Sequence, residues 1–354
     1  MKITAKLTDE APCLTKPSGG YEWWYFDAVS TDNEWSFVII FYEGNPFSTA
    51  YIKQMNEDGA GPLPGQFPAL SISLYRHGKP EFYSFVEYNP SDSEDIEGSI
   101  QIGHSFVKRY EDSELRYELD LDEKLPSGHQ IKASFSFTSA IPNPDLISKS
   151  GENHIWNLIQ PAANVSGIVN VTGKNGRYDL AFNGTGYHDH NTGLEPMKQS
   201  FYDWYWGRLH TDEFTLVYYL MCKQDKSLQS EAWLIDPSNQ LVLDELSHMA
   251  VEQKKANRFG LESNRSVKLT FGNGTFRISS RALIDSGPFY LRFMSEFEWD
   301  WGNKRGKGAG FSEYIRPKRI YSRVFWPLVH MRIRYRSRSP HWVQKNKRLY
   351  EVTW

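Results

Sequence analysis

Short segments of alternating apolar and polar residues recur along the chain. Residues 72–75, 131–137 and 267–271 alternate in this way, and Gly, Asn or Pro separates such segments at hairpin spacing, for example at 174–176. A period of two is that of a β-strand, whose successive side chains point to opposite faces. The sequence therefore predicts an all-β fold of sandwiches or up-and-down barrels. Residues 241–256 are the exception, for which we expect one or two helical turns.

The length of 354 residues is sufficient for two domains. A proline-rich passage from residue 141 to residue 161 precedes a new series of strand-like segments that starts at Val165. We therefore expect two β-domains, residues 1–185 and residues 186–354.

Several classes of protein are excluded early. No run of 18 apolar residues occurs, and the first residues contain no apolar stretch of signal-peptide length, so we expect a cytoplasmic protein. Cys13 and Cys222 are isolated and form no CxxC motif, so the sequence provides no support for a disulfide framework or a cysteine-ligated zinc site. Aromatic residues make up 15% of the chain, and this excess predicts either a large aromatic core or the wall of a hydrophobic site.

Charge is distributed unevenly. Residues 301–354 contain 14 Lys or Arg and 2 Asp or Glu, a net charge of +12, whereas the whole chain carries −3. One interpretation is a basic face that makes peripheral contact with an anionic membrane or a negatively charged partner. The alternative is a solvated strand face, because Arg332, Arg334, Arg336 and Arg338 follow a period of two. The basic segment contains no recognisable DNA-recognition helix, RNA-binding motif or zinc knuckle, so we expect no nucleic acid partner. The oligomeric state stays open.

The first aromatic motif covers residues 21–28. On a strand, one face carries Glu22, Trp24 and Phe26, and the opposite face carries Trp23, Tyr25 and Asp27. Such a strand either is buried on both sides or lines a pocket with a carboxyl group whose pKa is raised by burial.

The second motif, residues 182–193, is the most polar. Its ionisable and amide side chains lie between glycines and are costly to bury without partners. His188 and His190 would share one strand face, with Asp189 and Tyr187 on the other. We interpret the motif as catalytic, the alternative being a polar network that joins strands. The candidate catalytic residues are Asp189, His188, His190, Tyr187 and Asn191.

A metal site at the same place is not favoured. His188, His190 and Glu195 have the spacing of a cupin box, but Phe182 stands where that box requires Gly, and no second box follows. We therefore expect no metal.

A third motif, residues 201–210, places Trp204 and Trp206 on one strand face and Asp203 and Tyr205 on the other. Aromatic faces of this kind suit a flat conjugated or isoprenoid ligand, although a packed core would have the same pattern. Candidate pocket residues from these motifs and from two further segments are Glu22, Trp24, Phe26, Asp203, Trp204, Tyr205, Trp206, Tyr218 and Glu313, with His330 as a weaker candidate.

Four segments together resemble the carotenoid 1,2-hydratase (hydroxyneurosporene synthase) family and its AttH-like relatives. They are EWWYFDA at 22–28, GTGYHDHNTG at 184–193, WYWGR at 204–208 and GFSEY at 310–314. The resemblance implies two lipocalin-like (calycin-type) antiparallel β-barrels packed together, a hydrophobic site in or between them, and no organic cofactor. The same fold family includes Diels-Alderase-type pericyclases.

The chain departs from the hydratases at two places. Thr192 follows the HDHN residues where hydratases usually have Trp, and residues 217–221 supply tyrosines without a carboxylate. We therefore expect first a cofactor-independent cyclase that acts on an extended polyene or isoprenoid, with Asp189 and the two histidines polarising or protonating it. The alternatives are hydration of a terminal isoprenoid double bond and non-enzymatic carriage of a lipophilic metabolite.

Overall fold

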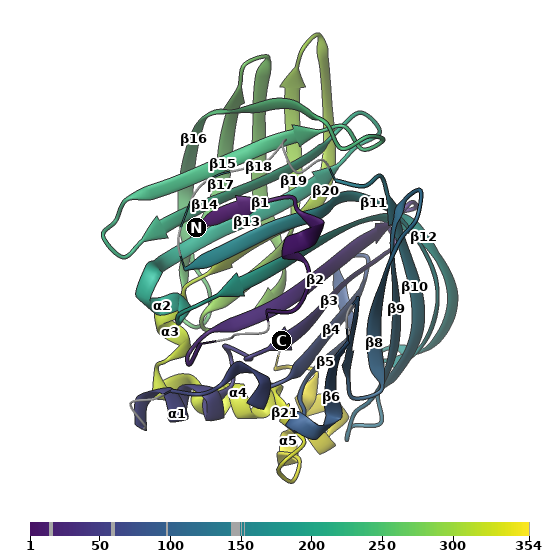
Figure 1. Ribbon diagram of the computed structural model, residues 1–354, viewed down its shortest axis with the longest axis vertical. Helices are drawn as coiled ribbons and strands as arrows, with labels where there is room; N and C mark the ends of the chain where they lie inside the picture. Colours follow the sequence, from purple (N-terminus) through teal and green to yellow (C-terminus); the bar gives the residue numbers. More distant parts are fainter. Residues whose placement is uncertain are drawn as a thin grey trace. The chain divides into compact units, whose positions relative to one another are not determined.

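The computed structural model describes residues 1–13, 17–57, 61–96, 98–142, 149, 151 and 153–353. These residues are mostly β-strands, as the alternation predicts (Figure 1). The chain divides into two compact units, one formed by Met1–Pro196 with Arg323–Trp354 and the other by Met197–Ser322. Across the described residues, no helix is long and apolar enough to cross a membrane.

This division differs from the expected boundary at residue 185. That residue lies within strand β12 (Gly176–Gly193), which pairs on both sides with neighbours of the first unit beyond residue 185. Pro161 also lies within a strand, β11 (His154–Gly173), where the pairing register shifts between Gln160 and Ala163. At such a bulge the missing N–H of proline is tolerated, so the strand continues through it.

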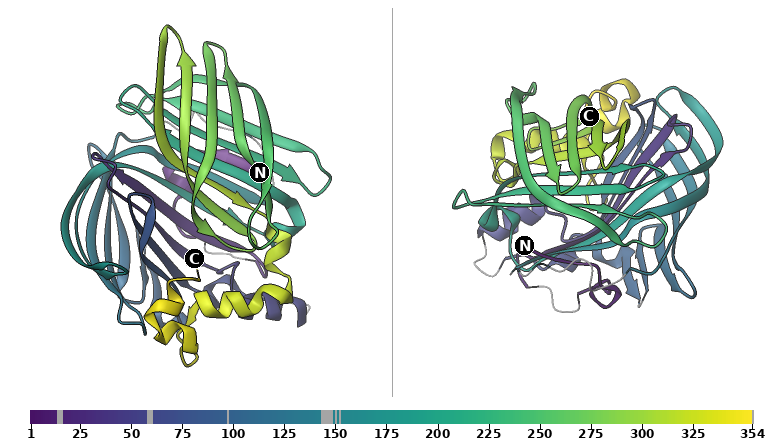
Figure 2. Two further views of the ribbon diagram at one scale, coloured as in Figure 1. Left: turned by 180° about the vertical axis from the view of Figure 1, so that it is seen from behind. Right: turned by 90° about the horizontal axis from the view of Figure 1, so that it is seen from above.

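The first unit is built on one curled sheet that does not close (Figures 1 and 2). Its strand order is β21-β5-β4-β3-β2-β12-β11-β10-β9-β8-β7-β6, and β1 pairs with β11 beside this path. Only β1 with β11 and β21 with β5 are parallel pairs among those described. The strands not yet given are β1 (Lys2–Thr4), β2 (Tyr21–Ser30), β3 (Trp35–Glu43), β4 (Ala69–Arg76), β5 (Lys79–Glu87), β6 (Ser93–Ile96), β7 (Ser99–Ile102), β8 (Ser105–Glu111), β9 (Leu115–Lys124), β10 (Gln130–Ser139) and β21 (Arg334–Tyr335).

An aromatic core fills the inner face of this sheet. Strand β10 alternates between buried and less buried positions, as expected for residues 131–137. Its Phe135 and Phe137 meet Phe37 of β3 at ring-centre distances of 4.3 and 6.1 Å, and Phe182 of β12 lies 5.1 Å from Phe37. Much of the aromatic excess in this unit is therefore core.

The second unit is a closed antiparallel barrel. Its strands, in order, are β13 (Phe201–His210), β14 (Thr215–Lys223), β15 (Leu228–Ile235), β16 (Val242–Ala256), β17 (Glu262–Phe271), β18 (Gly274–Ser286), β19 (Tyr290–Trp301) and β20 (Lys304–Ile315). The helical turns expected in residues 241–256 were a wrong prediction, because β16 pairs with β17 along this segment. Helices α2 (Met197–Ser200) and α3 (Pro317–Ile320) complete the unit.

The C-terminal segment returns to the first unit. It contains α4 (Trp326–Arg332), β21, α5 (Trp342–Lys345) and α6 (Lys347–Tyr350), and α4 contacts α1 (Thr49–Glu57) (Figure 1). The strand expected from the arginine spacing at 332–338 is limited to Arg334 and Tyr335. Pro327 in the first turn favours the helix instead, since its fixed φ suits that position.

Glu87 lies where β21 joins β5. Its Oε2 accepts a hydrogen bond from Asn45 Nδ2 at 3.1 Å, and its backbone carbonyl accepts one from the Arg336 N–H at 2.8 Å. Burial raises the pKa of Glu87 to about 7, an effect that hydrogen bonds from Ser48 and Asn45 only partly offset.

We expect Glu87→Gln to reduce the pH dependence of stability. Because the folded pKa is raised, the contribution of Glu87 is fully present below its unfolded value of 4.5 and is lost as pH rises through about 7. The free energy of unfolding of the wild type should therefore fall across this window, and the fall should be smaller in the variant. Urea titrations at several pH values measure it. Exposed Glu114→Gln is the control, and equal slopes for the two variants would contradict the assignment.

Candidate active site

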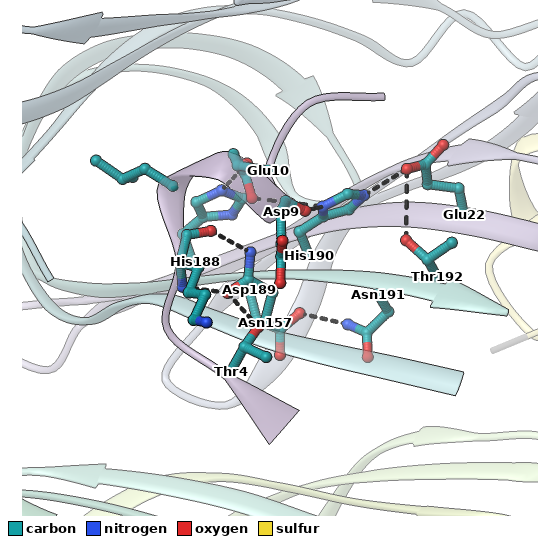
Figure 3. Close-up of polar contacts among 12 residues, drawn as sticks. Thr4, Asp9, Glu10, Glu22, Asn157, His188, Asp189, His190, Asn191 and Thr192 are labelled. Atoms are coloured by element: carbon teal, nitrogen blue, oxygen red, sulfur yellow. Dashed lines mark hydrogen bonds and ion pairs between the residues drawn. The ribbon is translucent and has the colours of Figure 1, made fainter. Parts of the chain in front are cut away.

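The polar motif lies at the end of β12, between β2 and β11. Its side chains alternate between the faces of the sheet as the sequence predicts (Figure 3). Tyr187, Asp189 and Asn191 are hydrogen bonded to one another on one face. His188 and His190 bind carboxylates on the opposite face.

Asp189 is the centre of the first group. Its Oδ2 accepts hydrogen bonds from Trp156 Nε1 and from the Tyr187 hydroxyl, both at 2.6 Å, and its Oδ1 accepts one from Asn191 Nδ2 at 2.7 Å. The residue is 4% exposed. Burial raises the pKa of Tyr187 well above its usual value, so this phenol stays a neutral donor. Three donors converge on one buried carboxyl group.

Aromatic rings accompany Asp189 on its own face. Tyr25 and Trp23 of β2 pair with Asp189 and Asn191, and directly opposed residues of an antiparallel pair share a face. The Tyr25 ring meets the Tyr187 ring edge-on at 6.0 Å. Trp156 was not among the predicted site residues. Its only signal was a tryptophan within an apolar run before Pro161.

The histidine face forms a buried ionic network. His188 Nε2 lies 2.9 Å from Glu10 Oε1, and His190 Nε2 lies 2.7 Å from Glu22 Oε1. Burial acts to lower the pKa of His190, but the charges of Glu10 and Glu22 outweigh it and raise the pKa. Its Nδ1 donates to the Asp9 carbonyl oxygen at 3.1 Å. His190 is therefore held as a cation between two carboxylates.

Two of the predicted substrate-binding residues support these histidines. Trp24 stacks on His190 at 4.7 Å, and Phe26 stacks on His188 at 3.9 Å. Beside them, Glu10, Trp24, Arg109 and Tyr117 help to line a cavity of about 20 Å³. A cavity of this size holds about one water molecule and is too small for a polyene. The structure thus places Glu22, Trp24 and Phe26 on the face opposite Asp189.

The remaining predicted residues form separate clusters in the second unit. Tyr314 donates to Asp203 Oδ2 at 3.0 Å, and its ring packs 4.7 Å from Tyr205. Burial raises the pKa of Asp203. Glu313 accepts hydrogen bonds from Arg292 Nε at 2.8 Å and from the Tyr290 hydroxyl at 2.6 Å. A carboxylate neutralised in this way is held in a fixed position.

The aromatic side chains of β13 lie on both faces of the strand, some inside the barrel and others on its outer face. Tyr218 and Leu209 belong to the core inside the barrel, and Gly207 lies against the Tyr218 ring. Alternation then places Tyr205 inside and Trp204 and Trp206 on the outer face of the barrel. The barrel interior is packed with side chains, so the tryptophans do not line a lumen. His330 belongs to the first unit, where it bonds Thr49 Oγ1 at 2.8 Å.

Among the residues that the structure describes, no group of three or more His, Cys, Asp or Glu side chains has an arrangement that could hold a metal ion. Glu195, the third residue of the cupin-like spacing, lies beside His154 at 3.5 Å.

Comparisons with known proteins identify the family. The family model "Carotenoid hydratase CrtC" matches residues 39–342. The chain is 30% identical over 350 residues to a hydroxyneurosporene dehydrogenase of Chlorobaculum tepidum, which covers 92% of this chain and 90% of that protein. It is 28% identical over 204 residues to an acyclic carotenoid 1,2-hydratase of Thiocapsa roseopersicina, covering 57% of this chain and 47% of the relative.

A solved structure supports the fold. The structure of a protein from Nitrosomonas europaea described as a putative AttH superimposes with a TM-score of 0.61 and 16% identity, over 87% of this chain and 95% of that one. It shares the lipocalin-like architecture. The extent of the family match and the near full-length relative lead to one conclusion: the chain belongs to the carotenoid hydratase CrtC family of enzymes.

Proposed function

We propose that the protein adds water to a carbon–carbon double bond of an isoprenoid substrate and that Asp189 is the acid. The observation that carries the proposal is the convergence of Trp156, Tyr187 and Asn191 on the buried Asp189 carboxyl group. Membership in a carotenoid hydratase family supports the substrate class.

The first step is protonation of the alkene. The Asp189 proton is transferred to the terminal carbon, a C–H bond forms, the π bond breaks, and the adjacent carbon becomes a tertiary cation. Alkenes are weak bases, so the acid must be strong. Donors that hydrogen bond to the ionised carboxylate stabilise it once the proton has left, and three such donors make Asp189 suited to this task.

The second step is capture of the cation. The π faces of Tyr25, Trp23 and Trp156, on the same side of the sheet as Asp189, would stabilise positive charge. A water oxygen bonds to the cation and loses one proton to the Asp189 carboxylate, which restores the acid. The sum is alkene plus water giving a tertiary alcohol, with no net change in the protein.

Cyclisation, our first expectation from the sequence, would start from the same protonation or proceed by a concerted closure. Its product is an isomer of the substrate, because a second double bond of the same molecule forms the new carbon–carbon bond and no water is added. Because the chain belongs to a carotenoid hydratase family, we propose hydration rather than cyclisation.

Turnover in heavy-oxygen water should separate the candidates. With an acyclic carotenoid as substrate, hydration predicts a product heavier by one water that carries the label on a tertiary carbon, as measured by mass spectrometry. An unlabelled isomer would establish cyclisation instead, and unchanged substrate bound tightly to the protein would favour a carrier. Boiled protein is the control for spontaneous addition.

A further inference from the structure

The C-terminal tip of the first unit presents an unusual surface. We define the tip as α5, α6 and Val352; α5 and α6 contact each other, and α5 lies below β21 in the view of Figure 1. Among its side chains, Trp342 is 64% exposed, Val352 65% and Leu349 38%. Lys345, Lys347 and Arg348 are exposed in the same short segment. Exposed apolar and cationic side chains are therefore interspersed along this short segment.

The tip is held firmly. Gln344 is buried, and its side-chain amide donates to the carbonyl oxygens of His330, Met331 and Ile333 at 3.2, 3.2 and 2.9 Å. Tyr350 is 2% exposed, and its ring lies 6.5 Å from that of Tyr83 in β5. The backbone of the tip is thus fixed by one set of residues while another set is left to solvent.

The charge of the tip is predominantly positive. Residues 336–353 contain a single acid, Glu351, which lies 3.8 Å from His129 and is largely covered. Lys345, Lys347 and Arg348 form no ion pair with a described residue, so their charge is available to a partner. Such a surface attracts anions.

We propose that this tip docks on the surface of a membrane containing anionic lipids. Tryptophan is favoured at the membrane–water boundary, where its ring is amphipathic, and Leu349 and Val352 would enter the acyl region beside it. Lysines and arginines next to them bind anionic headgroups. An acidic protein would satisfy the cations but would leave the three exposed apolar side chains without a matching environment. A lipophilic substrate dissolved in the same bilayer adds to the argument, and this point alone rests on the proposed function.

Vesicle sedimentation tests the proposal without substrate, so failure of the hydration chemistry would leave it standing. The full chain should sediment with vesicles of phosphatidylcholine and phosphatidylserine, and much less with phosphatidylcholine alone. The triple variant K345E/K347E/R348E should weaken binding about a hundredfold. The variant Trp342→Ala should weaken it on the order of tenfold by loss of buried apolar area.

Matched controls exist elsewhere on the first unit. The triple variant K79E/K108E/K132E makes the same change in net charge at exposed positions, and Ile168→Ala removes a side chain that is also 64% exposed. Both should bind vesicles as the wild type does, and thermal melting should show that every variant is folded. Absence of vesicle binding by the wild type, equal binding to neutral vesicles, or equal losses in test and control variants would each overturn the proposal. The proposal would also be overturned if the protein bound an acidic protein but did not bind anionic vesicles.

Discussion

Asp189→Asn should lose turnover by at least about 10³-fold while the protein stays folded, the upper range of effects for removal of a general acid. The asparagine amide occupies the same space, and its oxygen still accepts hydrogen bonds from Trp156 and Tyr187. It has no proton that can be transferred to an alkene. Rates of product formation under substrate saturation, together with thermal melting, measure the two expectations.

The neighbouring donors provide an internal comparison. Tyr187→Phe removes one of three hydrogen bonds to the carboxyl group and should cause a smaller loss, because Trp156 and Asn191 remain. Asp179→Asn, at an exposed position of the same strand, is the matched control and should be neutral. If Asp189→Asn retained at least half of the wild-type rate, Asp189 would not be the acid, whichever product forms.

The sequence predicted what local periodicity determines. Alternation gave the all-β class, and it placed Tyr187 and Asp189 on the opposite face to His188 and His190, as observed. Strand geometry fixes this alternation irrespective of what the strand packs against. Residues 241–256 were misassigned because long-range pairing with β17 determines their conformation.

The partners of the motif could not be predicted, because they come from distant segments. Glu10 and His188 are 178 residues apart in sequence, and Trp156 and Asp189 belong to adjacent strands whose register a bulge shifts. No pattern near Glu10 marks it as the partner of a histidine. The return of residues 323–353 to the first unit was missed for the same reason, since it is made by contacts with segments far away in sequence, such as the pairing of β21 with β5 and the contact of α4 with α1.

We expect the ionic network around His188 and His190 to stabilise the fold. Within this network, substitution of Glu22 should lower the free energy of unfolding the most. The Glu22 carboxylate accepts hydrogen bonds from His190 Nε2 at 2.7 Å and from the backbone N–H of Cys13 at 3.1 Å, and its side chain is fully buried. It therefore joins the N-terminal segment to the motif on β12. Surface pairs lack this property: Arg116 and Glu118 lie on one strand and are both more than a third exposed.

Glu22→Ala should lower the free energy of unfolding by about 3–5 kcal/mol, the usual cost of leaving one member of a buried ion pair without its partner. Because the pKa of His190 is raised, the pair's contribution is fully present below the unfolded value of 6.5 and is lost as pH rises through the folded value. The difference between wild type and variant should therefore shrink above pH 6.5. Urea unfolding at several pH values tests this, with Glu118→Ala as a control expected to cost less than about 1 kcal/mol. Glu22→Gln, which keeps an acceptor but no charge, should fall between them, and a loss in Glu22→Ala no larger than in the control would show that the network does not support the fold.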